Sequence, residues 1–192
     1  MSDDAYKQLL KEHLGSQAET KLLRRVLHLF GAPEDFELVF EGLMDATMDY
    51  FGAQSGALYM FDSDKEELYF ATARGPKAEA VMDLDISIKP GDGIAGNSFL
   101  NKEVIAVSDA HKDARFAKQV SDSVGYEVRS MLTLPIVSDG EALGVLQVLN
   151  KQGDSAFTGE EIDLGRRLGL YAGGLIGLGL ELQELQNAQS EE

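Results

Sequence analysis

Hydrophobic positions recur at helical spacing near both ends of the chain. Over residues 33–51 the apolar side chains stand three and four positions apart, which predicts an amphipathic helix. Shorter stripes of the same period predict a helical extension over residues 1–32, with Gly15 and Ser16 as a candidate break. The last helical pattern covers residues 158–187 and contains a long uncharged run.

Between these helices, short runs alternate apolar and polar residues, as half-buried strands do. Two pairs of runs are each joined by a short polar turn, which predicts two hairpins. Neighbouring hairpins favour a largely antiparallel sheet with helices to one side, so the expected fold class is α+β rather than a doubly wound parallel sheet. The expected strands are 55–62, 66–73, 85–88, 103–107, 130–137 and 141–151.

The chain length fits one domain with extensions. At 192 residues the chain can bury a core without disulfides or bound metal. We therefore expect an extension at 1–32, one domain with its terminal helices at 33–187, and a disordered tail at 188–192. The sequence contains no Cys, which excludes disulfides, thiolate nucleophiles and Cys-ligated metal sites.

The net charge of the chain limits the kinds of partner that it can bind. The 17 Lys and Arg against 33 Asp and Glu give a net charge of −16, which repels nucleic-acid phosphates and anionic membranes. The uncharged run at 168–180 is shorter than the roughly 20 residues of a membrane-spanning helix, so we expect a buried helix there. The first residues are polar and acidic, without the apolar segment of a signal peptide, and we expect a cytoplasmic protein.

Residues 91–96 match the GxGxxG pattern of dinucleotide-binding loops. Asp109 follows 18 residues after Gly91, close to where such a unit places an acid against the ribose. However, Pro90 interrupts the preceding strand and the unit is shorter than a βαβ unit, so we do not expect a dinucleotide site. Two interpretations remain, a tight turn or a helix N-terminus whose amides face an anionic ligand group.

The stretch from residue 91 to residue 151 resembles a GAF domain of the cyclic-nucleotide phosphodiesterase and adenylyl cyclase regulatory type. The resemblance runs through GDGIAGNSFLNKEVIAVSDAHKDARF, VGYEVRSMLTLPI and GVLQVLNK, and weaker matching extends over 35–185. It implies a profilin-like or PAS-like antiparallel sheet of about six strands, with the N- and C-terminal helices packed on one face. It also implies a regulatory domain that binds a small molecule.

The resemblance places a ligand pocket between the sheet and the loops around residues 91–128. Cyclic-nucleotide binders tend to carry hydroxyl or acidic residues at several positions where this chain has Ala, Val, Arg or Gln, which argues against cyclic GMP or AMP. Arg74 is a candidate anchor for a nucleotide or organic anion, and the alternative is a solvated loop residue. The implied pocket residues are Ala57, Ala73, Arg74, Ile94, Ala95, Asp109, Phe116, Ala117, Val124, Val128 and Gln147. Residues 126–129 form either a lid over this pocket or an ordinary packed loop.

The same family carries a signature of Asn-Lys, a gap, Phe, three residues and Asp-Glu. Here a Glu stands where the Asp would be, and Ile162 replaces the Glu. The resemblance implies a structural role, in which the Lys pairs with the acid and fixes the last helix. Independently of the family, Thr158 and the acid three residues later form a capping-box pattern. The motif positions are Asn150, Lys151, Phe157 and Glu161.

No constellation of nucleophile, base and orienting group emerges from the sequence, so we expect no enzymatic activity. The polar loop around Asp109 and His111 lacks the regular spacing of a metal site, and we expect no metal. Members of the fold that reduce methionine sulfoxide or carry bilin pigments depend on Cys, which is absent here. The one expected ligand is a small molecule, a nucleotide or an organic anion.

Glycines recur every four residues on the last helix, and each costs the helix roughly 1 kcal/mol relative to Ala. A compensating close approach of another element is therefore expected. The resemblance favours a parallel homodimer through terminal helices, with packing within one chain as the alternative. The expected interface positions are Gly169, Gly173 and Gly177.

Three functions remain open at this point. The first is a sensory module that binds a small molecule and signals to a separate partner protein, because the sequence contains no recognisable output domain. The second is a dimerisation or docking scaffold whose pocket has collapsed. The third is an uncharacterised enzyme. A real cavity beside Arg74 and Gln147 would favour the first, and a buried acid–base pair with shifted pKa values would favour the third.

Overall fold

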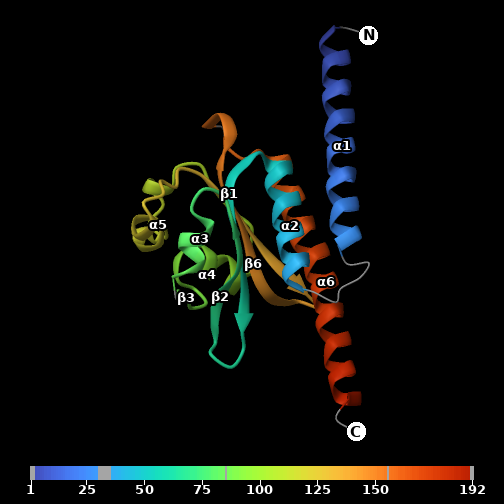
Figure 1. Ribbon diagram of the computed structural model, residues 1–192. Helices are drawn as coiled ribbons and strands as arrows, with labels where there is room; N and C mark the ends of the chain where they lie inside the picture. The colour runs from blue at the N-terminus through green and yellow to red at the C-terminus, as the bar shows by residue number, and fades with distance from the viewer. Residues whose placement is uncertain (1–2, 30–35, 85, 155, 191–192) are drawn as a thin grey trace.

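The computed structural model describes residues 3–29, 36–84, 86–154 and 156–190. Figure 1 shows a central sheet with helices on both sides. The helices are α1 (Asp3–Leu29), α2 (Phe36–Phe51), α3 (Ala78–Met82), α4 (Gly93–Asn101), α5 (Lys118–Val124) and α6 (Gly159–Ser190), with short 3-10 turns η1 (Ala110–Lys112) and η2 (Gln152–Asp154). The strands are β1 (Ala53–Asp62), β2 (Glu67–Arg74), β3 (Ser87–Ile88), β4 (Ile105–Val107), β5 (Met131–Ser138) and β6 (Glu141–Lys151).

The six strands form one sheet in the order β3-β2-β1-β6-β5-β4, and every neighbouring pair is antiparallel. Helices α1, α2 and α6 lie on one side of this sheet, and α3, α4 and α5 lie on the other (Figure 1). The expected α+β class, the antiparallel sheet and the terminal helices on one face are confirmed. Helix α3 was not expected from the sequence.

Successive side chains of the central strands point to opposite faces of the sheet. Leu58, Leu146 and Leu134 belong to the main core, which fills the layer between the sheet and α1, α2 and α6. The residues next to them in the sequence point to the opposite face. On that face Gln147 lies opposite Ala57 in the β1–β6 register and opposite Thr133 in the β5–β6 register. This face of the sheet therefore carries a polar side chain, Gln147, near its centre.

The glycine stripe of α6 packs against β5 of the same chain. A Cβ at Gly169 would overlap the carbonyl oxygen of Pro135, and one at Gly177 would lie 2.5 Å from Ser138 Oγ. A Cβ at Gly173 would overlap the carbonyl oxygen of Val137. These glycines let a helix backbone approach a strand backbone. The expectation that they contact a second subunit was wrong, because the strand of the same chain already occupies that face.

Helix α1 is continuous through Gly15 and Ser16, so the expected break there was wrong. Its C-terminal half belongs to the main core, since Leu22 and Val26 are buried there. Ion pairs join it to α6, from Arg167 to Glu19 at 2.7 Å, and to α2, from Arg25 to Asp49 at 2.8 Å.

The sequence placed the domain boundary at residue 33, between two helices that share this core. Residue 33 itself lies outside the described residues. At the other end, α6 runs to Ser190, so residues 188–190 are helical rather than a disordered tail. Among the described helices, none is long and apolar enough to cross a bilayer.

A candidate ligand-binding cavity

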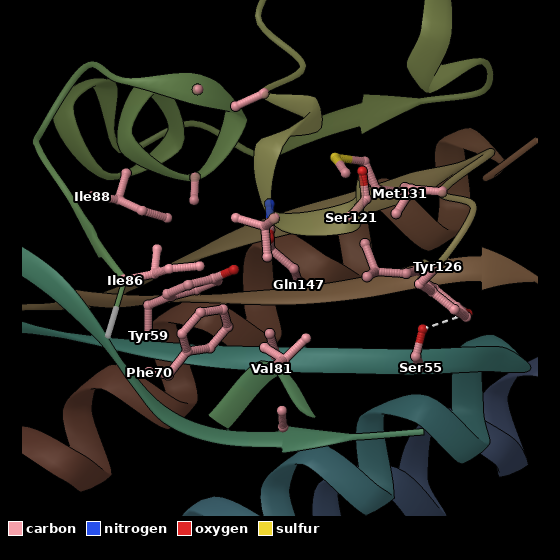
Figure 2. Close-up of a pocket in the computed structure, with 18 of the residues that line it drawn as sticks. Ser55, Tyr59, Phe70, Val81, Ile86, Ile88, Ser121, Tyr126, Met131 and Gln147 are labelled. Atoms are coloured by element: carbon pink, nitrogen blue, oxygen red, sulfur yellow. Dashed lines mark hydrogen bonds between the residues drawn. The ribbon is translucent and has the colours of Figure 1, made fainter. Parts of the chain in front are cut away.

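A cavity of about 280 Å³ lies between the sheet and the segments that cover its outer face. Its floor comes from β1, β2, β5 and β6, and its walls come from α3, α4, α5 and the chain that follows α5 (Figure 2). Most of the lining side chains are aliphatic or aromatic. Ligand pockets typically enclose about 300–1,000 Å³, so this cavity suits a small ligand.

The structure brings together every pocket residue expected from the sequence except Asp109. Ala57, Ala73, Arg74, Ile94, Ala95, Phe116, Ala117, Val124, Val128 and Gln147 all line the cavity. Sequence reasoning missed several larger side chains on the same walls, namely Tyr59, Phe70, Val81, Ile86, Ile88 and Met131. For Tyr59 a signal was present, because it stands two residues after Ala57 on the same face of one strand.

Asp109 does not line the cavity. Its carboxylate lies 2.7 Å from the Lys112 ammonium, one turn further along the loop. The hydrogen bond from Lys112 lowers the pKa of Asp109. The structure thus does not bring Asp109 together with the other expected pocket residues, because an ion pair with Lys112 holds its carboxylate on the loop.

Arg74 reaches the cavity, but two carboxylates of α2 already neutralise it. Its guanidinium lies 2.8 Å from the Glu41 carboxylate and 3.0 Å from the Asp45 carboxylate. The hydrogen bond to Glu41 is the largest cause of a raised pKa at Arg74. Arg74 therefore links β2 to α2 through ion pairs. It is neither a free anchor for an anion nor a solvated loop residue, the two alternatives that the sequence left open.

Two buried polar side chains face the cavity from the centre of the sheet. Gln147 is 6% exposed, and its amide nitrogen donates to Thr133 Oγ1 at 2.9 Å, which fixes the orientation of the amide. Tyr59 is 5% exposed, and burial raises the pKa of its phenol well above the ordinary value. Figure 2 shows both side chains pointing into the cavity.

Tyr126 closes one end of the cavity through a hydrogen-bonded cluster. Its hydroxyl accepts from Ser55 Oγ at 2.7 Å and from Asn150 Nδ2 at 3.1 Å. Asn150 also donates to the Glu127 carbonyl at 2.8 Å and accepts from the Arg129 amide at 2.7 Å. The segment 126–129 is thus pinned to β1 and β6 at its start and its end, as a fixed wall of the cavity.

The residue after Asn150 connects this cluster to α6. Lys151 Nζ lies 2.7 Å from Glu161 Oε2 and 5.5 Å from the centre of the Phe157 ring. Glu161 Oε2 also accepts from the Thr158 amide at 2.7 Å, and Thr158 Oγ1 accepts from the Glu161 amide at 3.2 Å. The expected Lys–acid pair and capping box are both confirmed, so Glu161 ties the strand to the first turn of the helix.

The GxGxxG stretch forms a tight turn. Gly91 and Gly93 have φ values of 91° and 62°, and the Gly91 amide donates to the Gly96 carbonyl at 2.8 Å. A Cβ at Gly96 would overlap the Lys89 carbonyl oxygen. Asn97 Nδ2 donates to the Gly91 and Gly93 carbonyls, at 2.6 Å each. Turn geometry and close packing thus account for all three glycines. In the described part of the chain, no group of three His, Cys, Asp or Glu side chains is arranged to hold a metal.

The GAF domain family model matches residues 35–175. The chain belongs to the GAF domain family. A cGMP-specific 3',5'-cyclic phosphodiesterase of Drosophila sechellia is 32% identical over 117 residues, which are 59% of this chain and 9% of that protein. The corresponding protein of Drosophila melanogaster is 35% identical over 91 residues, 46% of this chain and 8% of that protein. The chain therefore spans less than a tenth of the length of these relatives.

Solved GAF structures show the same fold at low sequence identity. A GAF domain from a Coxiella burnetii phosphoenolpyruvate-protein phosphotransferase matches with a TM-score of 0.75 and 20% identity, covering 88% of this chain and 98% of that one. A free methionine-R-sulfoxide reductase of Neisseria meningitidis, in complex with its substrate, matches with a TM-score of 0.65 and 18% identity over 95% of both chains. The GAF domain of a phosphotransferase and a free methionine-R-sulfoxide reductase thus share the fold of this chain.

Proposed function

We propose that this GAF domain is a cytoplasmic regulatory module that binds a small molecule and has no catalytic role of its own. The observation that carries the proposal is the cavity, which is open to solvent on one side, has mainly apolar walls and has Gln147 at its floor. A collapsed scaffold would have filled this space with side chains. The module changes the state of its terminal helices on binding and signals through them to a separate partner protein.

A chain of contacts supports this coupling. Tyr126 in the cavity wall bonds to Asn150, and the next residue, Lys151, is paired with Glu161 at the start of α6. On the other side, Arg74 links the cavity to α2 through Glu41 and Asp45. A ligand that displaces Tyr126 or Arg74 therefore acts on a helix of the opposite layer. Signalling requires that the ligand bind one arrangement better than the other.

Binding is expected to raise the melting temperature. A ligand present at about 100 times its Kd adds about 2.7 kcal/mol to the free energy of unfolding. For a chain of this size, that corresponds to a rise of roughly 5–10 °C. A thermal-shift screen of nucleotides, cyclic nucleotides, amino acids and organic acids measures it. Cyclic GMP belongs in the panel because of the similarity to phosphodiesterase regions.

A pair of matched variants locates the binding. Ala57→Phe places a ring in the cavity and is expected to abolish the shift, whereas Ala106→Phe adds the same ring at an exposed position on β4 and leaves it intact. A shift that survives Ala57→Phe would place the ligand elsewhere. No shift with any compound would favour the scaffold function.

We further propose a parallel homodimer, now through the outer face of α6 rather than its glycine stripe. Exposed and half-buried apolar residues on this face alternate in steps of four and three, the a and d pattern of a coiled coil. A shallow groove between α1 and α6 continues this face, with Leu23 and Leu27 on α1. The pattern on α6 consists of Tyr171, Leu175, Leu178, Leu182 and Leu185.

Charge placed on this seam is expected to separate the subunits. Leu178→Glu puts a carboxylate at the middle of the seam, so we expect a monomer in sedimentation velocity at concentrations where the unmodified chain sediments as a dimer. Leu100→Glu makes the same change at a comparably exposed position on α4 and is expected to leave the dimer unchanged. A dimer that persists in Leu178→Glu would move the interface away from α6.

A further inference from the structure

We infer that the cavity selects an uncharged ligand that offers a hydrogen-bond acceptor to Tyr59 and a donor to Gln147, and is otherwise apolar. This inference rests on the proposed function and specifies its ligand. It starts from two polar groups whose hydrogen-bonding capacity is not used within the described part of the chain.

The first of these groups is the hydroxyl of Tyr59. The residue is 5% exposed, and burial alone raises its pKa, with no hydrogen bond contributing. In the described part of the chain, no side-chain nitrogen or oxygen is both fully inaccessible and unpartnered. The hydroxyl is therefore open to the cavity, toward which Figure 2 shows it pointing. At neutral pH a phenol with a raised pKa keeps its proton, so it is available to donate.

The second group is the amide oxygen of Gln147. One N–H of its amide donates to Thr133 Oγ1, which orients the amide and leaves its oxygen as an acceptor without a partner in the described part of the chain. Gln147 lies opposite Ala57 on the neighbouring strand, and Tyr59 lies two residues further along the same face. Side chains at such diagonal positions are within reach of one small molecule. An amide-like group, with its donor and acceptor side by side, matches this pair.

The charges around the cavity argue against an anion. Arg74 is balanced by Glu41 and Asp45, so it offers no net positive charge to a ligand. At the mouth, the exposed side chains of Lys77 and Asp92 carry opposite charges. Deep in the cavity, Tyr59 and Gln147 are neutral. An anionic group there would lose its hydration without a charged partner, which is costly.

The remaining surface selects a flat or apolar body. The rings of Tyr59 and Phe70 lie 4.5 Å apart at 37°, and they form one wall of the cavity. Aliphatic side chains from α3, α4 and the β3 segment complete the surroundings, with Val81, Ile94 and Ile88 among them. Such walls favour ligands that bury apolar surface area. The two polar groups then determine which of these ligands the cavity selects.

Pairs of compounds that share a ring system and differ in charge test the inference. The probes are nicotinamide with nicotinate, indole-3-acetamide with indole-3-acetate, and guanosine with cyclic GMP, each titrated at millimolar concentration and followed by NMR shifts of the protein. We expect the neutral member of at least one pair to bind 10-fold or more tightly than its anionic partner. Equal or tighter binding of the anions would overturn the inference and leave the proposed function standing.

Single-group variants then test the two contacts. Tyr59→Phe removes one hydroxyl and keeps the ring, and we expect the affinity for the neutral probe to fall about 3- to 10-fold. Gln147→Leu is expected to have an effect of similar size. The control Tyr69→Phe removes a hydroxyl from an exposed ring on the neighbouring strand β2, opposite Met60, and should change nothing.

An affinity unchanged in both Tyr59→Phe and Gln147→Leu would overturn the assignment of these two groups. If no probe of either charge binds, the inference is overturned, and the thermal-shift screen decides separately on the proposed function.

Discussion

Replacing Gly173 with alanine is expected to destabilise the fold by about 3 kcal/mol, at the upper end of what overpacking costs. The added Cβ would overlap the carbonyl oxygen of Val137 and lie 2.6 Å from its nitrogen. Both obstacles are backbone atoms of β5 near its C-terminal end, so neither can rotate away as a side chain would. Relief requires α6 to shift away from the sheet, which would open the main core around Leu168 and Ile176.

The neighbouring glycine provides a matched control. Around Gly174 no atom of another element lies within 4 Å of where a Cβ would stand. Gly174→Ala is therefore expected to stabilise the helix by up to about 1 kcal/mol through helix propensity alone. Urea denaturation of the two variants measures the difference. If Gly173→Ala proved as stable as Gly174→Ala, α6 would not rest on β5 as closely as described.

Asn150→Ala is expected to cost about 4 kcal/mol, the second large effect. The change removes the hydrogen bonds that Asn150 makes with the Arg129 amide, the Glu127 carbonyl and the Tyr126 hydroxyl. Each hydrogen bond in such a partly buried position contributes about 1 kcal/mol. Asn150 also adopts a φ of 55°, which Asn tolerates and alanine adopts less readily.

Asn150→Gly separates these two causes. Glycine accepts the positive φ but restores none of the hydrogen bonds, so it should recover only about 1 kcal/mol of the loss. Amide hydrogen exchange is expected to show faster opening of residues 126–130 in both variants. Near-native stability of both variants would mean that water replaces the Asn150 side chain without cost, and that the wall of the cavity does not depend on it.

The strands of the sheet could be predicted well because the features that indicate them, alternation and turn residues, are local in the sequence. The two hairpins follow from alternation and from turns such as Ser138-Asp139-Gly140, and their observed bounds differ from the expected ones by a residue or two. Helix α3 has only five residues and no buried side chain, so it lacks the apolar stripe that makes a helix visible in a sequence.

The candidate site was predicted less completely because its chemistry depends on distant partners. Arg74 could be placed at the cavity, but the acids that neutralise it stand about 30 positions earlier, on another element. Asp109 was misplaced because Lys112, three residues on, captures its carboxylate. The polarity of the cavity could therefore be misjudged from the sequence wherever an ion pair decided it, whether with a distant residue as at Arg74 or with a near one as at Asp109.

The glycine stripe of α6 also shows that the sequence does not identify the partner of a contact. Its four-residue period correctly indicated a close approach by some element, but a period on one helix carries no information about what approaches. The answer came from β5, whose backbone carbonyls at Pro135 and Val137 meet Gly169 and Gly173. The seam available to a second subunit lies on the outer side of the helix, around Leu178.

The length of α6 has a mechanical consequence. Its 32 residues form one unbroken helix of about 48 Å. It starts at the capping box, which Lys151 joins to the end of β6, and projects beyond the rest of the domain at its C-terminal end (Figure 1). Because α6 packs on β5 and α2 as far as Gly179, only its last 11 residues are free to tilt without disturbing the core. A tilt of about 5° at Gly179 displaces Ser190 by about 1.5 Å. The exposed end of the helix therefore moves more than the core does, and a partner in contact with that end would sense the change.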